Sequence, residues 1–79
     1  MRKQINNVVY DTKGEGVEMV AARGWKGRYV TILYRGKNGG WFFKSDGALI
    51  TTTEEGAYKW LVCNDKTDAL NKYFPLREA

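Results

Sequence analysis

The sequence predicts a single α+β domain over residues 1–79, with an antiparallel sheet of three to five strands packed by two short C-terminal helices. Two observations lead to this fold class. Up to residue 50, short β-branched and aromatic runs alternate with glycine- and asparagine-containing turns, which is typical of a hairpin followed by a meander. After residue 51, apolar residues recur at helical spacing instead. A chain of this length has room for one core, because a small domain buries only about 60% of the surface that its unfolded form exposes.

The first strands are predicted as an N-terminal hairpin. Asn6 and Asn7 tolerate positive φ and separate the β-prone runs 3–5 and 8–10. Residues 11–16 then predict a loop, in which Asp11 and Thr12 form an Asx or Ser/Thr turn. The run 17–22, Val-Glu-Met-Val-Ala-Ala, fits a helical turn or a strand, and the glycines on both sides favour the strand.

The clearest strand of the meander is Arg28–Arg35, in which six consecutive positions are β-branched, aromatic or aliphatic. Its alternation places Val30, Ile32 and Tyr34 on one face and Tyr29, Thr31 and Leu33 on the other. If the helices cover the Val30 face, Tyr29 and Leu33 remain open. Turns at 36–40 and 45–47 then predict two further strands, at 41–44 and 48–50.

Two helices are predicted after the sheet. Thr52 and Glu55 have the spacing of a capping box, and Ala57, Trp60 and Leu61 should face the sheet with Trp60 as the central core residue. A second helix follows a break at residues 64–65 and ends before Pro75, while residues 76–79 are expected to fray. Its apolar positions are Ala69, Leu70, Tyr73 and Phe74.

Composition argues against most catalytic classes. Histidine is absent and Cys63 is the only cysteine, so the sequence predicts no internal disulfide, no metal site and no cofactor. Without a histidine to activate it, Cys63 is interpreted as a half-buried residue near a helix end. The carboxylates Asp11, Glu15, Glu18 and Asp46 lie in predicted turns or at strand edges, and the glycine spacing matches no phosphate-binding loop. The sequence therefore predicts a binding protein without catalytic residues.

Location is inferred from what the sequence lacks. No stretch approaches the roughly 20 apolar residues of a membrane span, and residues 1–9 lack the apolar segment of a secretory signal. We therefore expect a soluble, intracellular protein that does not contact membranes.

Charge is distributed unevenly along the chain. Residues 1–44 hold nine bases and three acids, whereas residues 45–79 hold four bases and six acids. Between residues 19 and 45 there is no acid, and six basic residues are interleaved with aromatic ones. From this stretch we predict a partner-binding surface made of Arg28, Tyr29, Arg35, Lys37, Trp41 and Lys44.

Two interpretations fit this basic, aromatic stretch. Uncovered rings rimmed by arginine are typical of the core of a protein interface, with either a foreign protein or a second copy of the chain as the partner. Alternatively, Tyr29, Trp41 and Phe43 stack on the bases of single-stranded nucleic acid while the basic side chains neutralise phosphates. The first is favoured, because so small a domain needs most of its rings for its own interior and because the net charge of +4 is modest for a nucleic-acid-binding module.

Three segments resemble a known group of proteins: Lys3-x-Ile5-Asn6-Asn7-x-x-Tyr10-Asp11-Thr12, the aromatic run 41–43, and Leu-Ile-Thr-Thr-Thr-Glu-Glu-Gly-Ala-x-x-Trp at 49–60. The chain is similar to small bacterial proteins of phages and other mobile elements that open K-x-I-N-G-x-x-Y-D-T. The family has no assigned activity. The resemblance implies a mobile-element origin and, by context, an anti-CRISPR type of inhibitor acting in the bacterial cytoplasm on a host protein or nucleoprotein complex, such as a CRISPR effector.

Overall fold

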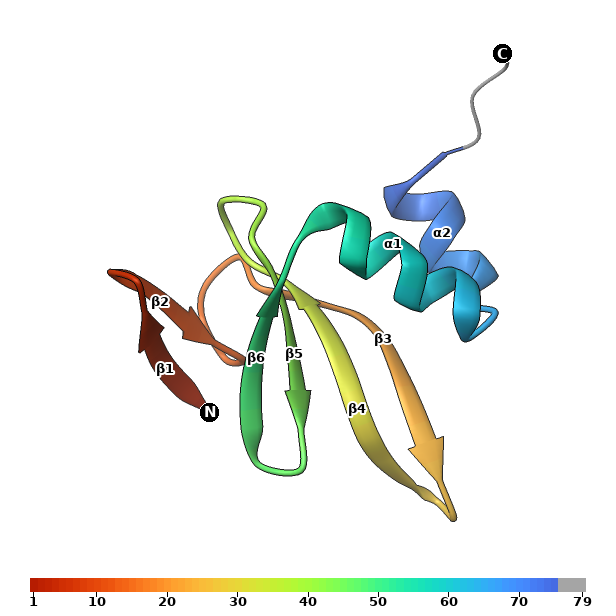
Figure 1. The fold of residues 1–79 in the computed structure, drawn as a ribbon, viewed down its shortest axis with the longest axis horizontal. Helices are drawn as coiled ribbons and strands as arrows, with labels where there is room; N and C mark the ends of the chain where they lie inside the picture. Colours follow the sequence, from red (N-terminus) through yellow and green to blue (C-terminus); the bar gives the residue numbers. More distant parts are fainter. Residues whose placement is uncertain (76–79) are drawn as a thin grey trace.

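A computed structural model describes residues 1–75, with the backbone alone for Trp25, Arg28 and Tyr29 (Figure 1). Six strands are followed by two helices. Their order is β1 (Arg2–Ile5), β2 (Val8–Asp11), β3 (Glu18–Trp25), β4 (Arg28–Arg35), β5 (Trp41–Ser45), β6 (Ala48–Thr52), α1 (Glu54–Cys63) and α2 (Thr67–Tyr73). The expected fraying falls on residues 76–79, which lie outside the described part of the chain.

The predicted α+β fold class is confirmed. The strands form an antiparallel two-stranded hairpin, β1-β2, and an antiparallel four-stranded meander in the order β3-β4-β5-β6. Three of the hairpin turns have two central residues, both with positive φ, which is the geometry that matches the right-handed twist of the strands. These pairs are Asn6-Asn7, Lys26-Gly27 and Asp46-Gly47.

The ambiguous run 17–22 is a strand, as predicted, and β3 is longer than predicted because it continues to Trp25. Two register shifts interrupt its pairing with β4, one between Met19 and Ala21 and one between Arg23 and Gly24. Such bulges bend a strand and increase its twist. β5 and β6 also extend past the predicted ends, to Ser45 and Thr52.

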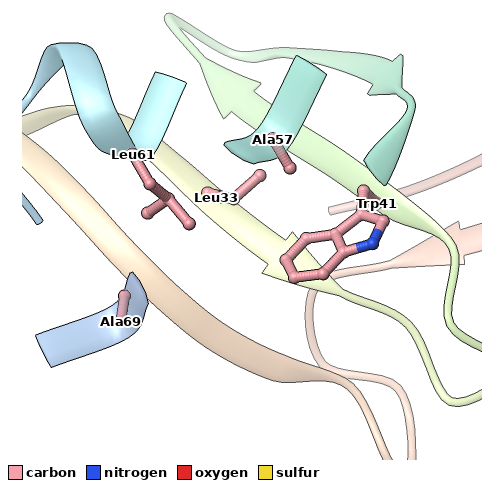
Figure 2. Close-up of a cluster of buried hydrophobic side chains, with 5 residues drawn as sticks. All are labelled: Leu33, Trp41, Ala57, Leu61 and Ala69. Atoms are coloured by element: carbon pink, nitrogen blue, oxygen red, sulfur yellow. The ribbon is translucent and has the colours of Figure 1, made fainter. Parts of the chain in front are cut away.

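The main core lies between the helices and one face of the meander. Leu33, Trp41, Ala57, Leu61 and Ala69 are buried together there, and Figure 2 shows the side chains of both helices directed at those of the sheet. The helices therefore cover the Leu33 face of β4 and not the Val30 face. Leu33 pairs with Ala21 on β3 and with Phe43 on β5, so these three residues form an apolar row on this face. Ala57 and Ala69 have small side chains, which allow the helices to approach this row closely.

A second, thinner core lies on the opposite face of the same sheet. Phe42 is 1% exposed and Leu49 is also buried, although neither belongs to the helix-side cluster. The ring of Phe42 stacks on Tyr34 at 5.3 Å and meets the edge of Tyr10 from β2 at 5.4 Å. The N-terminal hairpin is thus anchored through Tyr10.

Within α1, Leu61 and not Trp60 is the central core residue. Leu61 and Ala57 are four residues apart, fully buried, and face the sheet directly. Trp60 is half-buried at the side of the helix, with its ring 5.4 Å from that of Phe43. The prediction identified the correct face of α1 but placed its centre on the larger residue.

The helix cap lies one residue later than predicted. Thr53 is the N-cap of α1, and its Oγ1 accepts a hydrogen bond of 3.0 Å from the backbone N–H of Gly56, while Thr52 is the last residue of β6. Because the third helical position is Gly56, no side chain is available there to complete a capping box.

This shift makes a testable prediction. Thr53→Ala should lower the free energy of unfolding by about 1 kcal/mol. The substitution removes the hydroxyl that accepts the hydrogen bond from the Gly56 N–H, which has no partner within the helix. The neighbouring Thr52→Ala serves as the control in chemical denaturation and should cost less. A larger loss of unfolding free energy from Thr52→Ala than from Thr53→Ala would show that Thr52 is the N-cap, as the sequence predicted.

Candidate binding surface

The structure does not gather the six predicted binding residues into one patch. Arg28 and Tyr29 begin β4 and Arg35 ends it, so they are separated by most of an eight-residue strand, about 23 Å at roughly 3.3 Å per residue. Lys44 pairs with Ile32 and therefore faces away from the helices, whereas Trp41 pairs with Arg35 on the helix side. Among the four of these residues whose side chains the structure describes, Arg35 and Trp41 are in contact, with the guanidinium 5.6 Å from the centre of the ring.

Trp41, predicted as a binding residue, lies in the helix-side core. Its side chain is 7% exposed. The ring lies against two residues at the end of the second helix, edge-on to Tyr73 at 5.8 Å and stacked on Phe74 at 5.5 Å. A small domain uses its large aromatic side chains where they bury most surface, and Trp41 fills the gap between sheet and helices.

Arg35 takes part in a polar cluster that joins α2 to the sheet. It pairs across the strands with Glu18, and its guanidinium also lies 5.9 Å from the ring of Tyr73. The hydroxyl of Tyr73 donates a hydrogen bond of 2.5 Å to Glu18 Oε2, and the Lys72 ammonium lies 5.2 Å from the same ring. Sequence reasoning missed this contact because the partners are 55 residues apart.

The cluster shifts the pKa values of two groups in opposite directions. The hydrogen bond from Tyr73, with the nearby Lys72 charge, holds the pKa of Glu18 below its ordinary value. Burial and the same hydrogen bond raise the pKa of Tyr73. The contribution of Glu18 to stability is therefore lost as pH falls through its lowered pKa, and that of Tyr73 is lost as pH rises through its raised one.

We expect Tyr73→Phe to return the pKa of Glu18 toward its ordinary value, since the largest cause of the shift is removed. An NMR titration of the Glu18 carboxyl carbon measures this directly. Tyr58→Phe, which changes an exposed ring on α1, is the control and should leave the titration unchanged. An equally lowered pKa in Tyr73→Phe would contradict the assigned hydrogen bond.

Lys37 belongs to a different region, in the tight turn between β4 and β5. The turn is closed by a hydrogen bond of 2.6 Å from Gly36 N–H to the Gly40 carbonyl. The side chain of Lys37 lies against Gly16, where an added Cβ would stand 3.0 Å from Lys37 Cγ. Gly16 has φ +75, so this close approach and this backbone conformation both favour glycine.

Between this turn and the N-terminal hairpin lies a cleft of about 280 Å³. We call it the hairpin cleft. Val8 and Val9 contribute apolar surface to it and are 50% and 49% exposed. Charges of both signs surround them, namely Arg2, Lys37, Asp11 and Glu15.

Local hydrogen bonds hold the rim of the hairpin cleft. Asp11 Oδ1 accepts from the backbone N–H of Lys13 at 2.9 Å, which confirms the predicted Asx turn. The terminal amine of Met1 donates to Thr12 Oγ1 at 2.9 Å, and the Thr12 N–H donates to the Met1 carbonyl. The hairpin therefore has a closed base, while its valines remain half exposed.

The remaining chemistry of the described residues is sparse. Cys63 is exposed at the end of α1, where half burial had been expected. Within residues 1–75, no three His, Cys, Asp or Glu side chains lie together in a way that could hold a metal ion. Neither α1 nor α2, the helices of the described chain, has the length and apolar run needed to cross a membrane.

No protein-family model matches the chain, and comparisons with curated proteins and with solved structures find no match.

Proposed function

We propose that this chain is a non-enzymatic binding protein that contacts a protein partner through the hairpin cleft. The observation that carries the proposal is the exposure of Val8 and Val9, two consecutive β-branched residues that both remain about half exposed beside a concave surface. Consecutive strand residues face opposite sides, so neither face of the hairpin is covered at this point. Burial of both side chains needs another molecule.

The lining of the hairpin cleft suits a protein partner. Apolar side chains at the centre and charged ones around them are the usual anatomy of a protein interface. Arg2, Lys37, Asp11 and Glu15 all line the cleft, and Arg2 and Asp11 are cross-strand partners in the hairpin. A partner with charges of both signs can therefore be complemented. The two carboxylates offset the two basic residues, so the lining has no net positive charge to attract a polyanion.

The alternative of single-stranded nucleic acid stacked on the sheet is weakened by the positions of the rings. Trp41 is buried, and Phe43 lies partly buried against Trp60. Two of the three rings proposed for stacking are thus occupied within the domain. Protein contact is favoured for this reason.

The biological setting of the proposal rests on the sequence resemblance alone. It places the protein on a phage or another mobile element and makes it an inhibitor of the anti-CRISPR type, binding a host defence complex in the bacterial cytoplasm. The concrete partner is a protein or nucleoprotein complex such as a CRISPR effector, bound stoichiometrically and without turnover.

The test is affinity capture from host lysate, with and without nuclease treatment, using the immobilised wild-type chain and two matched variants. Val8→Lys with Val9→Lys replaces both half-exposed valines that line the hairpin cleft with charged residues. Met19→Lys with Val62→Lys places two charges on exposed apolar residues elsewhere and is the control.

Wild type and control should capture the same partner, and the cleft variant should capture at least about tenfold less, as expected when central interface residues are lost. Circular dichroism confirms that each variant is folded. Equal capture by the cleft variant, or loss of capture on nuclease treatment alone, would remove the hairpin cleft from the proposal.

A further inference from the structure

The hairpin of β3 and β4 is longer than the rest of the sheet and projects from it. β5 pairs only with residues 31–35 of β4, so Arg28 and Tyr29 at the start of β4 have β3 as their only neighbouring strand. Figure 1 shows this two-stranded ribbon extending past the β5–β6 turn, on the end of the sheet away from the helices. We call residues 23–29 the ribbon tip.

The ribbon tip is basic along its whole length. Arg23, Lys26 and Arg28 fall within six residues, and the sequence has no acid between residues 19 and 45. Gly27, in the turn, has open space where a side chain would begin. The nearest turn at this end of the sheet carries one acid, Asp46. The bases are therefore concentrated at the end of a narrow, two-stranded ribbon.

We propose that the ribbon tip binds double-stranded DNA by entering its major groove. Two antiparallel strands lie about 4.8 Å apart, and the major groove of B-form DNA, about 12 Å wide, admits such a ribbon. The positive charge of the ribbon tip then neutralises phosphates along the groove. The bulge between Arg23 and Gly24 adds twist, which helps a ribbon follow a groove.

Shape favours a duplex over the other polyanions. Single strands are bound by flat platforms of exposed rings, whereas this feature is a ribbon two strands wide. The major groove of an RNA duplex is deep and narrow, so a ribbon should not enter it. This inference does not depend on the hairpin cleft, which lies at the opposite end of β4 and carries charges of both signs.

Fluorescence anisotropy measures binding of the whole chain to a DNA duplex of about 20 base pairs over a series of salt concentrations starting near 50 mM. The matched probes are an RNA duplex of the same sequence, one of the DNA strands alone, and poly-glutamate. The ribbon variant is Arg23→Gln, Lys26→Asn and Arg28→Gln, with asparagine chosen because residue 26 has φ 49. The control variant, Lys3→Gln, Lys13→Gln and Lys59→Gln, loses the same charge from other surfaces.

The wild type and the control should bind the DNA duplex at least tenfold more tightly than the ribbon variant. Loss of three phosphate contacts should lower the slope of log affinity against log salt by about three in the ribbon variant. Asp46→Asn should tighten binding, since it removes an acid from the same end of the sheet.

Equal binding by the ribbon and control variants would overturn the proposal, because affinity would then follow net charge alone. Equal affinity for the RNA duplex, the single strand or poly-glutamate would overturn the groove assignment. A chain that binds DNA through the ribbon but fails in the cleft capture experiment would retain this inference and lose the proposed protein contact, so the two failures are distinguishable.

Discussion

Trp41→Ala is expected to lower the free energy of unfolding by about 3 to 5 kcal/mol, the usual loss when a buried Trp is truncated. The ring of Trp41 is 7% exposed and joins the sheet to the end of α2 through Tyr73 and Phe74. A domain of this size has a total stability of roughly 4 to 12 kcal/mol. The variant should therefore be largely unfolded at a moderate denaturant concentration that leaves the wild type folded.

Urea denaturation followed by far-ultraviolet circular dichroism measures this loss. Trp41→Phe is the control: it keeps an aromatic ring at the position and should lose less stability. A Trp41→Ala chain as stable as the wild type would show that the ring is not part of the core and would restore it as a candidate for partner contact.

Phe42→Ala should cost a similar 3 to 5 kcal/mol by removing the centre of the second core. Phe42 is held between Tyr34 of the sheet and Tyr10 of the hairpin, and this contact is the aromatic anchor of the hairpin. Its loss should therefore also release β1 and β2 from the sheet, beyond the general loss of stability.

Hydrogen exchange separates the two effects. In Phe42→Ala, the amides of β1 and β2 should lose protection to a greater degree than those of β4, whereas Leu61→Ala should lower protection throughout the meander. Uniform loss of protection in both variants would mean that the hairpin and the meander unfold as one unit and that Phe42 does not anchor the hairpin separately.

The two cores explain what surface remains for binding. Rings on both faces of the sheet are used to build the domain, on one side beneath the helices and on the other beneath Tyr10. The hairpin cleft and the ribbon tip, near the two ends of β4, are the surfaces that we propose for binding.

Strand and turn positions were predictable because the physical causes are local. Asn6-Asn7 adopts positive φ in a two-residue turn for reasons contained in those two residues, and the alternation of β4 depends only on its own eight positions. The cap of α1 was misplaced by one residue because Thr52 and Thr53 have the same side chain. Which of them caps depends on where β6 ends.

The candidate site was less predictable, since it depends on which residues the fold brings together. Arg35 and Trp41 were predicted separately as binding residues, and the structure brings them into a contact that is directed at α2. Lys37 was identified from charge alone, without any sign of the cleft that it lines. Val8 and Val9 were assigned to a strand with no role, because no local pattern reveals that a hairpin will stay uncovered.

The amino-acid sequence by itself determined the strands, turns and helices of this protein. The signals for them are glycine and asparagine turns, β-branched runs and a change to helical spacing, and each of these acts over a few residues. Only the tertiary structure decided which sheet face the helices cover, which rings are buried and which charges are left at the ends of β4. These depend on contacts between residues far apart in the chain, such as Glu18 with Tyr73, whose energies no short window of sequence contains.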